Sequence, residues 1–342
     1  MKKAIITGVT GQDGSYLAEL LLKKKYKVVG IMRRTSSFNT ERIDKLYKLF
    51  PKKFNTKYGD ILDVKSITNI IDEEKPDEIY HLAAQSHVGI SFDMPEYTFL
   101  NNSLPTLTIL EHIKKYHNNI KFYQACSSEM FGKSPPPQSE NTTFLPQSPY
   151  GISKVAAYYL TNYYRSAFKI FASTGILFNH ESPRRGLNFV TRKITFNICK
   201  LLKKEIKYIE LGDVSTKRDW GYAGDYVEAI WKIMQYKKSD NFVISTGFNY
   251  SILDFVNECF KIINLDSKKY IKINVKKYMR PAEVPNLLGD SNKARKLLKF
   301  KPKVNFQTLC KKMLVSDLKK NGITLKEAKK LANKLKINEK NK

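Results

Sequence analysis

The N-terminal end of the sequence constrains the possible fold more than any other part. A short apolar run is typical of a buried parallel strand, and helical periodicity begins at Ser15. Between them, Gly8, Gly11 and Gly14 form a G-x-x-G-x-x-G pattern. Glycines at this point let the chain turn tightly and let a pyrophosphate approach backbone N–H groups at the positive end of a helix. The pattern therefore predicts a dinucleotide site on an α/β sheet.

The end of the second expected strand, residues 26–32, indicates which dinucleotide binds. Arg33 and Arg34 follow it directly, with hydroxyls behind them that include Ser36. An NAD site usually carries Asp or Glu here, whereas paired guanidiniums suit a 2′-phosphate. NADP is therefore predicted. The alternative is that a strongly basic chain simply has arginines in its loops.

Two later strand ends are also expected beside the cofactor. Asp60 and Ile61 follow one strand, where the carboxylate could accept from the adenine amino group. The strand at residues 78–82 ends in H-L-A-A-Q-S, whose small residues up to Ser86 would let a cofactor lie close to the backbone.

Tyr150 and Lys154 form a Tyr-x-x-x-Lys motif that predicts acid–base chemistry. The spacing of i and i+4 places both side chains on one helix face. A nearby ammonium stabilises phenolate, so we expect Lys154 to lower the pKa of Tyr150 and make it a usable base. The motif follows Ser127-Ser128-Glu129. The competing interpretation is a surface tyrosine beside a solvated lysine.

Strand and helix patterns alternate through the first half of the chain and predict a doubly wound parallel (Rossmann) sheet. Strands are expected at residues 121–125 and 171–178, with a helix at residues 150–168. The proline-containing loop at residues 133–148 is expected to border the substrate cleft.

The second half of the chain predicts a smaller, interleaved substrate domain. We expect an NADP domain at residues 1–178, with a returning segment at about 214–247 that brings a strand at 241–247 back to the main sheet. Residues 179–323 would form most of the substrate domain. Residues 324–342 would form a basic tail, in which Leu325, Ala328, Ala332 and Leu335 share one side of a helix.

The formal net charge of +28 makes polyanion binding the rival class of function. Lysines are spread along the chain, and neither a zinc-finger spacing nor an RNA-recognition motif occurs, so nucleic-acid binding is not expected. No apolar run approaches a membrane span, and no signal peptide is recognisable, so a cytoplasmic enzyme is expected. Scattered cysteines predict buried free thiols and no metal site.

Together these motifs resemble extended short-chain dehydrogenase/reductases, and more closely the GDP-mannose 4,6-dehydratase family. The similarity runs from Met1 to about Leu318, and the most specific strings lie at residues 33–42 and 179–186. It implies a lyase that removes water from GDP-mannose to give GDP-4-keto-6-deoxymannose, for deoxysugar or GDP-fucose-type or surface polysaccharide synthesis. NADP would be reduced and reoxidised in each turnover.

The resemblance also implies roles for individual residues. Tyr150 would take the proton of the sugar 4-hydroxyl, Lys154 would hold the phenolate and the nicotinamide ribose, and Ser127 would bridge the 4-hydroxyl to Tyr150. Glu129 would remove the C5 proton and then assist loss of the C6 hydroxyl. A plain epimerase or reductase has no evident need of this carboxylate, although a structural ion pair for Glu129 is the alternative.

Two larger sets of contacts are carried over in the same way. The expected cofactor contacts are Gly8, Thr10, Gly11, Gln12, Asp13, Gly14, Arg33, Arg34, Ser36, Asp60, Ile61, Leu82, Ala84, Ser86, Tyr97, Tyr150, Lys154, His180 and Arg185. The expected substrate contacts are Ser86, Ser127, Glu129, Asn179, Val190, Lys193, Arg218, Arg280 and Glu283.

Two segments depart from the usual GDP-mannose pattern. Residues 81–88 are H-L-A-A-Q-S-H-V instead of N-L-G-A-M-S-H-V, and residues 101–105 also differ. Both lie near the expected hexose, so GDP-manno-heptose is an alternative substrate. The nucleotide motifs argue against dTDP-glucose.

The resemblance further implies a homodimer or homotetramer. The loop at residues 33–42 is longer than 2′-phosphate binding requires, and in the family it reaches a neighbouring subunit. Ser36, Ser37 and Arg42 are the interface candidates.

Overall fold

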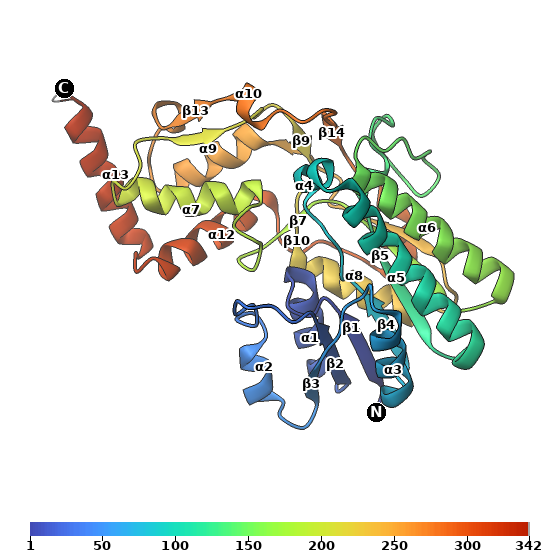
Figure 1. Cartoon of the computed structure of the whole chain (residues 1–342). Coiled ribbons are helices and arrows are strands. Elements are labelled where there is room, and N and C mark those ends of the chain that lie inside the picture. Colours follow the sequence, from blue (N-terminus) through green and yellow to red (C-terminus); the bar gives the residue numbers. More distant parts are fainter. Residues whose placement is uncertain (341–342) are drawn as a thin grey trace.

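A seven-stranded parallel sheet forms the centre of the larger lobe. The computed structural model describes residues 1–340, with side chains described through residue 336 (Figure 1). The strand order is β3-β2-β1-β4-β5-β6-β11, which confirms the predicted doubly wound sheet. The strands are β1 (Lys3–Thr7), β2 (Lys27–Met32), β3 (Phe54–Tyr58), β4 (Glu78–His81), β5 (Lys121–Ser127), β6 (Ala172–Leu177) and β11 (Asn241–Ile244).

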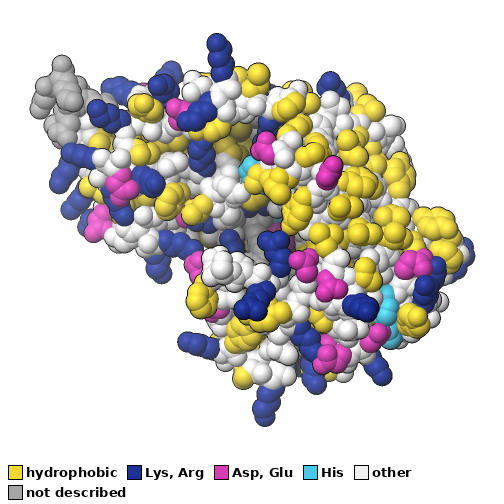
Figure 2. Space-filling view, in the orientation of Figure 1, with side chains coloured by type: hydrophobic (Ala, Val, Ile, Leu, Met, Phe, Trp, Pro, Cys, Tyr) yellow, Lys and Arg dark blue, Asp and Glu magenta, His cyan; other side chains and the backbone are white. Residues whose placement is uncertain are grey.

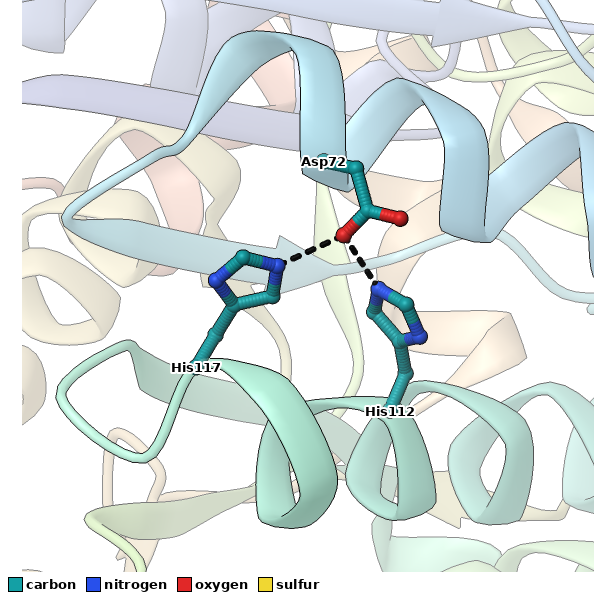
Figure 3. A group of neighbouring side chains, drawn as sticks. All are labelled: Asp72, His112 and His117. Atoms are coloured by element: carbon teal, nitrogen blue, oxygen red, sulfur yellow. Dashed lines mark hydrogen bonds and ion pairs between the residues drawn. The ribbon is translucent and has the colours of Figure 1, made fainter.

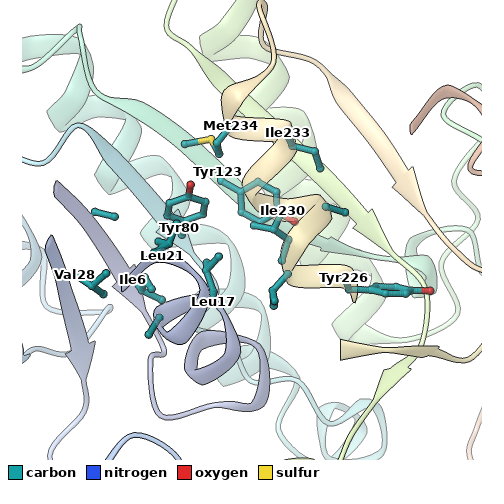
Figure 4. Close-up of a cluster of buried hydrophobic side chains, with 14 of the residues drawn as sticks. Ile6, Leu17, Leu21, Val28, Tyr80, Tyr123, Tyr226, Ile230, Ile233 and Met234 are labelled. Atoms are coloured by element: carbon teal, nitrogen blue, oxygen red, sulfur yellow. The ribbon is translucent and has the colours of Figure 1, made fainter. Parts of the chain in front are cut away.

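Helices cover both faces of this sheet because its strands are apolar on both sides. Successive residues of β1 face opposite cores: Ile6 packs with α1 (Gln12–Lys23) and α8 (Ala223–Gln235), as Figure 4 shows. Ile5 instead packs in the core under the helices of the other face. These are α3 (Val64–Glu74), α5 (Pro95–Tyr116) and α6 (Pro149–Phe168). Full burial of such a side chain contributes about 1.5–3 kcal/mol.

A smaller lobe lies beside the carboxyl edge of the sheet and has its own core (Figure 1). Trp220 stacks near Phe306, and a buried ion pair of 2.7 Å joins Arg192 to Asp317. The principal elements of this lobe are β7 (His180–Glu181), α7 (Val190–Leu202), β8 (Ile209–Leu211), β9 (Lys217–Arg218), α9 (Ile252–Ile262), β13 (Ile271–Ile273), α10 (Val275–Tyr278), β14 (Asn286–Leu287), α12 (Phe306–Lys320) and α13 (Leu325–Lys340).

The smaller connecting elements complete the two lobes. They are α2 (Asp44–Leu49), α4 (Val88–Asp93), η1 (Ser128–Met130), β10 (Gly221–Tyr222), β12 (Tyr250–Ser251), η2 (Ser267–Lys269) and α11 (Asn292–Leu298). Val214 and Trp220 pack in the core of the smaller lobe, whereas α8 and β11 belong to the main sheet and its core.

Two elements begin or pack differently from what the sequence alone indicated. Helix α1 begins at Gln12, three residues before the expected start at Ser15, so Gly14 lies within its first turn. The C-terminal segment forms α13, and Ala328 and Ala332 are fully buried against the smaller lobe. The last two residues of the expected tail, 341–342, lie outside the described residues.

The described part of the chain contains no helix with the length and apolar character needed to span a membrane. Lysine and arginine side chains are scattered over the face shown in Figure 2. The four cysteines are buried and free, as predicted. Cys126 lies next to the expected site, but burial raises the pKa of its thiol to about 12, so it stays protonated.

Candidate active site

A cleft of about 1000 Å³ opens between the carboxyl edge of the sheet and the smaller lobe. Both lobes contribute to its walls, as expected for a ligand site in an α/β protein. It collects all of the predicted catalytic and substrate residues and several of the predicted cofactor residues. The predicted residues that line it are Asp13, Leu82, Ala84, Ser86, Ser127, Glu129, Tyr150, Lys154, Asn179, His180, Arg185, Val190, Lys193, Arg218, Arg280 and Glu283.

The end of β5 and the beginning of α6 bring together the predicted acid–base residues. Ser148 caps α6 by accepting from the Gly151 N–H at 3.0 Å, which fixes the first turn that carries Tyr150. The Ser127 hydroxyl lies beside the Tyr150 phenol and acts to lower its pKa. One turn further on, Lys154 Nζ donates to the Ala125 carbonyl at 3.0 Å.

The effect of Lys154 on Tyr150 differs from the prediction. Burial raises the pKa of Tyr150 to about 12, and the Ser127 hydroxyl only partly opposes this. Burial likewise lowers the pKa of Lys154 to about 8. The ammonium lies 6.0 Å from the Tyr150 ring centre and donates to a carbonyl, so the protein alone does not produce the expected phenolate.

Glu129 is buried in η1, directly after the strand that carries Ser127. Its backbone N–H donates to Ser127 Oγ at 3.2 Å, which holds the short turn. Arg218 Nε lies 3.9 Å from Glu129 Oε1, a long ion pair, while Arg218 Nη2 lies 3.3 Å from Glu283 Oε1. Arg218 therefore connects the expected base to the expected nucleotide-binding segment without holding Glu129 in a close ion pair.

The glycine turn after β1 has no room for larger side chains. Gly8 has a φ of +70°, and a Cβ there would lie 2.9 Å from Ala83 Cα. A Cβ on Gly14 would lie 2.3 Å from the Gly8 carbonyl oxygen. The bare turn leads into the N-terminus of α1, so the residues present fit a pyrophosphate-bearing cofactor.

Asp13 and His180 join this turn to the smaller lobe. His180 Nε2 lies 2.7 Å from Asp13 Oδ2, and Gln12 donates to the His180 carbonyl at 3.0 Å. Burial opposes a charge on His180, but the Asp13 carboxylate outweighs it and raises the pKa of the imidazole. Arg185, on the same segment, lies over the Phe189 ring at 3.6 Å.

The predicted adenosine-side residues lie outside the cleft, along the carboxyl edge of β1, β2 and β3. Arg33, Arg34 and Ser36 are exposed directly after β2, and Arg33 Nη1 donates to Tyr97 Oη at 3.1 Å. Asp60 Oδ1 accepts from the Leu62 N–H at 3.0 Å, beside Ile61. Thr10 and Gly11 belong to the glycine turn.

The loop predicted to reach another subunit is only partly exposed. Ser36 and Ser37 are exposed, but Arg42 turns back onto its own chain. Its Nε donates to the Arg184 carbonyl at 2.7 Å and its Nη1 to the Thr10 carbonyl at 3.2 Å. Arg42 therefore braces the glycine turn within one subunit.

His81, at one of the two departures from the family pattern, is buried and neutral. The Thr7 hydroxyl accepts from the N–H groups of Leu82 and Ala83, so its own hydrogen is left to donate to His81 Nδ1 at 2.9 Å. This assigns the ring proton to Nε2. Burial lowers the pKa of His81 to about 3.

Several cleft residues were not singled out from the sequence. Phe189 lies against His87 with ring centres 5.4 Å apart, and Tyr278 lies under the Lys193 ammonium at 4.0 Å. His87 and Tyr278 adjoin motifs that were recognised, so proximity in sequence was a usable signal. Phe189 directly precedes Val190, an expected substrate contact, so the same signal applied to it.

Comparisons with known proteins agree with this geometry. A family model described as GDP-mannose 4,6 dehydratase matches residues 5–313. GDP-mannose 4,6 dehydratase 1 of Arabidopsis thaliana is 47% identical over 326 residues, covering 93% of this chain and 90% of that protein.

Solved structures show the same fold at lower identity. A dTDP-glucose 4,6-dehydratase from Bacillus anthracis in complex with NAD has a TM-score of 0.81 at 20% identity, covering 94% of this chain and 97% of that chain. RMD from Pseudomonas aeruginosa complexed with NADPH has a TM-score of 0.77 at 20% identity, covering 94% of this chain and 100% of that chain. Both neighbours hold a nicotinamide cofactor.

Proposed function

The chain belongs to the GDP-mannose 4,6-dehydratase family, and we propose that it converts GDP-mannose into GDP-4-keto-6-deoxymannose and water. The observation that carries this proposal is the cleft in which Ser127, Glu129, Tyr150 and Lys154 gather on one wall. The pair of a phenol and a separate carboxylate matches a reaction that needs both oxidation and elimination. The family match leaves polyanion binding without support.

NADP, when bound, would supply a hydride acceptor for C4 and a hydride donor for C6. We propose that the glycine turn, with Gln12 and Asp13, holds its pyrophosphate, and that Arg33, Arg34 and Ser36 hold its 2′-phosphate. The exposed guanidiniums after β2 support this choice, because no acidic side chain stands there to pair with a ribose 2′-hydroxyl.

The chain's own residues would move the protons. Tyr150 takes the proton of the sugar 4-hydroxyl, either directly or by way of the Ser127 hydroxyl, and Lys154 stabilises the phenolate. For Tyr150 to act as this base, its pKa must fall from the high value that burial imposes on the protein alone. Glu129 removes the C5 proton, which the 4-ketone acidifies, and passes it to the departing C6 hydroxyl. The proton that Tyr150 took from the 4-hydroxyl would then be delivered to C5, which restores the phenolate, so one water is lost overall.

The other half of the cleft would bind the nucleotide diphosphate. We propose that Arg218 and Arg280 face the phosphates, since both line the cleft and guanidinium groups donate in pairs to phosphate oxygens. Glu283 pairs with both arginines, at 3.3 and 3.5 Å, and is placed to accept from the guanine or the ribose. Asn179, Val190 and Lys193 complete this wall.

The sugar is tested by incubating the purified protein and NADP⁺ with GDP-mannose, GDP-manno-heptose or dTDP-glucose in parallel. Mass spectrometry should report loss of one water from GDP-mannose without net reduction of the cofactor. Dehydration of the heptose alone would identify GDP-manno-heptose as the substrate. Dehydration of none of the three would contradict the proposed function.

Replacing Arg33 and Arg34 together with serine is expected to weaken NADP⁺ binding by about 10–100-fold, because charge-assisted hydrogen bonds to the 2′-phosphate are lost. The affinity for NAD⁺ should change little. Calorimetric titration with both cofactors measures the two constants, and Lys52→Ser, which removes an exposed cation after α2, is the control. Equal losses for NADP⁺ and NAD⁺ would contradict 2′-phosphate recognition.

We propose that the protein forms a homodimer or homotetramer. Two exposed surfaces support this: the loop at residues 33–42, where Phe38 is fully exposed, and an apolar groove between α5 and α6. The groove is lined by Phe99, Leu100 and Ile152, and Figure 2 shows hydrophobic side chains gathered over these helices. A patch of this kind on an otherwise charged protein is typical of a subunit interface.

A charge in the apolar groove is expected to break the assembly. Phe99→Glu should shift the protein from dimer or tetramer to a smaller species, because the carboxylate would be buried without a partner. Sedimentation velocity measures the species present. Leu49→Glu, at a similarly exposed apolar position on α2, is the control. A wild-type protein that sediments as a fully active monomer would contradict the proposal.

We also propose that the chain divides into an NADP domain, residues 1–178 with a return at about 214–247, and a GDP-sugar domain formed mostly by residues 179–323. The separate cores of the two lobes support this division. Within the return, α8 and β11 pack with the main sheet, whereas Val214 packs with the smaller lobe. A cytoplasmic location is proposed as well, since four buried free thiols suit a reducing compartment.

A further inference from the structure

Asp72, His112 and His117 form a cluster outside the active-site cleft (Figure 3). Asp72 lies near the end of α3, His112 near the end of α5, and His117 directly after α5. Both helices end just before the strands β4 and β5 begin, so the cluster lies at the amino edge of the parallel sheet. The glycine turn and the catalytic residues lie at the opposite, carboxyl edge. The cluster is therefore separate from the site described above.

The three side chains direct their ligand atoms to one point. His112 Nε2 and His117 Nε2 each lie 2.6 Å from the same oxygen, Asp72 Oδ1, as the dashed lines in Figure 3 show. The three ligand atoms lie within 4.8 Å of one another. Two imidazoles compete for one carboxylate oxygen, while Oδ2 accepts no hydrogen bond from any residue that the structure describes. If the two imidazoles only hydrogen-bonded to the carboxylate, each would be expected to use a different oxygen.

We propose that Asp72, His112 and His117 bind a divalent transition-metal ion of the Zn²⁺ type. Zinc lies about 2.0–2.2 Å from imidazole nitrogen and carboxylate oxygen, which places tetrahedral ligand atoms roughly 3.3 Å apart. The two 2.6 Å contacts would therefore open by less than about 1 Å to admit the ion.

The burial of the cluster suits a site with one coordination position left for water. The side chain of His112 is 9% exposed and that of His117 is 20% exposed, while Asp72 is 49% exposed. Two imidazoles and one carboxylate favour Zn²⁺, Ni²⁺ or Cu²⁺ over Mg²⁺ or Ca²⁺, which prefer oxygen ligands. The ion would join α3 to α5 across 40 and 45 residues of sequence, which is a structural role.

The site was not expected from the sequence. His112 and His117 are close in sequence, but the third ligand comes from α3, which precedes β4 in the chain. Only the packing of α3 against α5 brings Asp72 to the two histidines.

The test uses the full-length protein, stripped with a chelator and then titrated with ZnCl₂ in competition with a chromophoric chelator. The wild type is expected to bind one equivalent that is absent from the double variant His112→Gln/His117→Gln. Loss of an outer-sphere partner typically weakens metal binding by roughly 10–100-fold. Asp72→Asn removes a direct ligand, so it should weaken Zn²⁺ binding by at least as much. The midpoint temperature of thermal unfolding should rise by about 3–5 °C when the Zn²⁺ concentration is a hundred times its Kd. MgCl₂ should leave this temperature unchanged.

Glu73→Gln is the matched control, because Glu73 is the adjacent carboxylate on α3 and pairs with Lys57 instead of the histidines. It should bind zinc as the wild type does. Co²⁺ provides a readout that does not depend on stability: the wild type should show ligand-field absorption that Asp72→Asn and His117→Gln lose. The proposal is overturned if the double variant keeps the wild-type equivalent, or if the wild type binds Zn²⁺ more weakly than about 1 mM.

Discussion

Replacing Glu129 with glutamine is expected to lower the rate of dehydration by about 10²–10⁴-fold, the usual contribution of a positioned general base. The amide keeps the size of the side chain but cannot accept the C5 proton. Ser127, Tyr150 and Lys154 remain in place, so oxidation at C4 should continue. The variant should therefore accumulate one equivalent of reduced nicotinamide per active site, after which turnover should stop. Stopped-flow absorbance and mass spectrometry measure the two steps separately.

The control for this variant is Glu140→Gln. Glu140 is a partly buried glutamate outside the cleft, and its Oε1 accepts from the Val243 N–H at 2.7 Å, a role that an amide oxygen can also fill. Its dehydration rate should match that of the wild type. If Glu129→Gln keeps full dehydration, the carboxylate is not the base, and its 3.9 Å approach to Arg218 would be only structural.

The fold of the larger lobe followed from local patterns in the sequence. The apolar run before Gly8 and the alternation of strands and helices fix a parallel sheet, because only helices on both faces can bury strands that are apolar on both sides. The Tyr150–Lys154 spacing placed both side chains on one helix, and α6 carries them as expected. These signals depend on residues that are near one another in the chain.

The rest of the site depends on contacts between distant segments, which no local pattern encodes. Asp13 meets His180 across 167 residues, and Arg218 approaches both Glu129 and Glu283. The high pKa of Tyr150 is likewise a consequence of burial, which the motif alone does not specify.

Two local details also differ from what the sequence indicated. Arg42 belongs to a loop that was expected to face another subunit, yet its guanidinium finds two carbonyl oxygens within its own chain. Helix α1 starts earlier than its periodicity indicated, because the glycines allow the turn of the helix to begin against Gly8.

Replacing Tyr150 with phenylalanine is expected to abolish both steps, with a loss of about 10²–10⁴-fold or more in kcat. Without the hydroxyl, no group accepts the proton of the sugar 4-hydroxyl, so C4 is not oxidised and the C5 proton is not acidified. In contrast with Glu129→Gln, no reduced nicotinamide should accumulate at any time. Binding of the GDP-sugar should change little, because the ring and its burial are kept.

The pH dependence separates a proton acceptor from a packing residue. Burial raises the pKa of Tyr150 to about 12. At pH values below the pKa that Tyr150 has in the complex with cofactor and substrate, the phenolate fraction rises up to about tenfold per pH unit. The wild-type kcat should therefore rise with pH on the acid side, and the residual rate of Tyr150→Phe should not. Tyr158→Phe is the matched control on α6, since its hydroxyl accepts from Asn241 Nδ2 at 2.8 Å, outside the cleft. It should keep the wild-type profile. If Tyr150→Phe retained both the profile and the hydride transfer, another base would take the 4-hydroxyl proton, and the buried phenol would serve only to position the sugar.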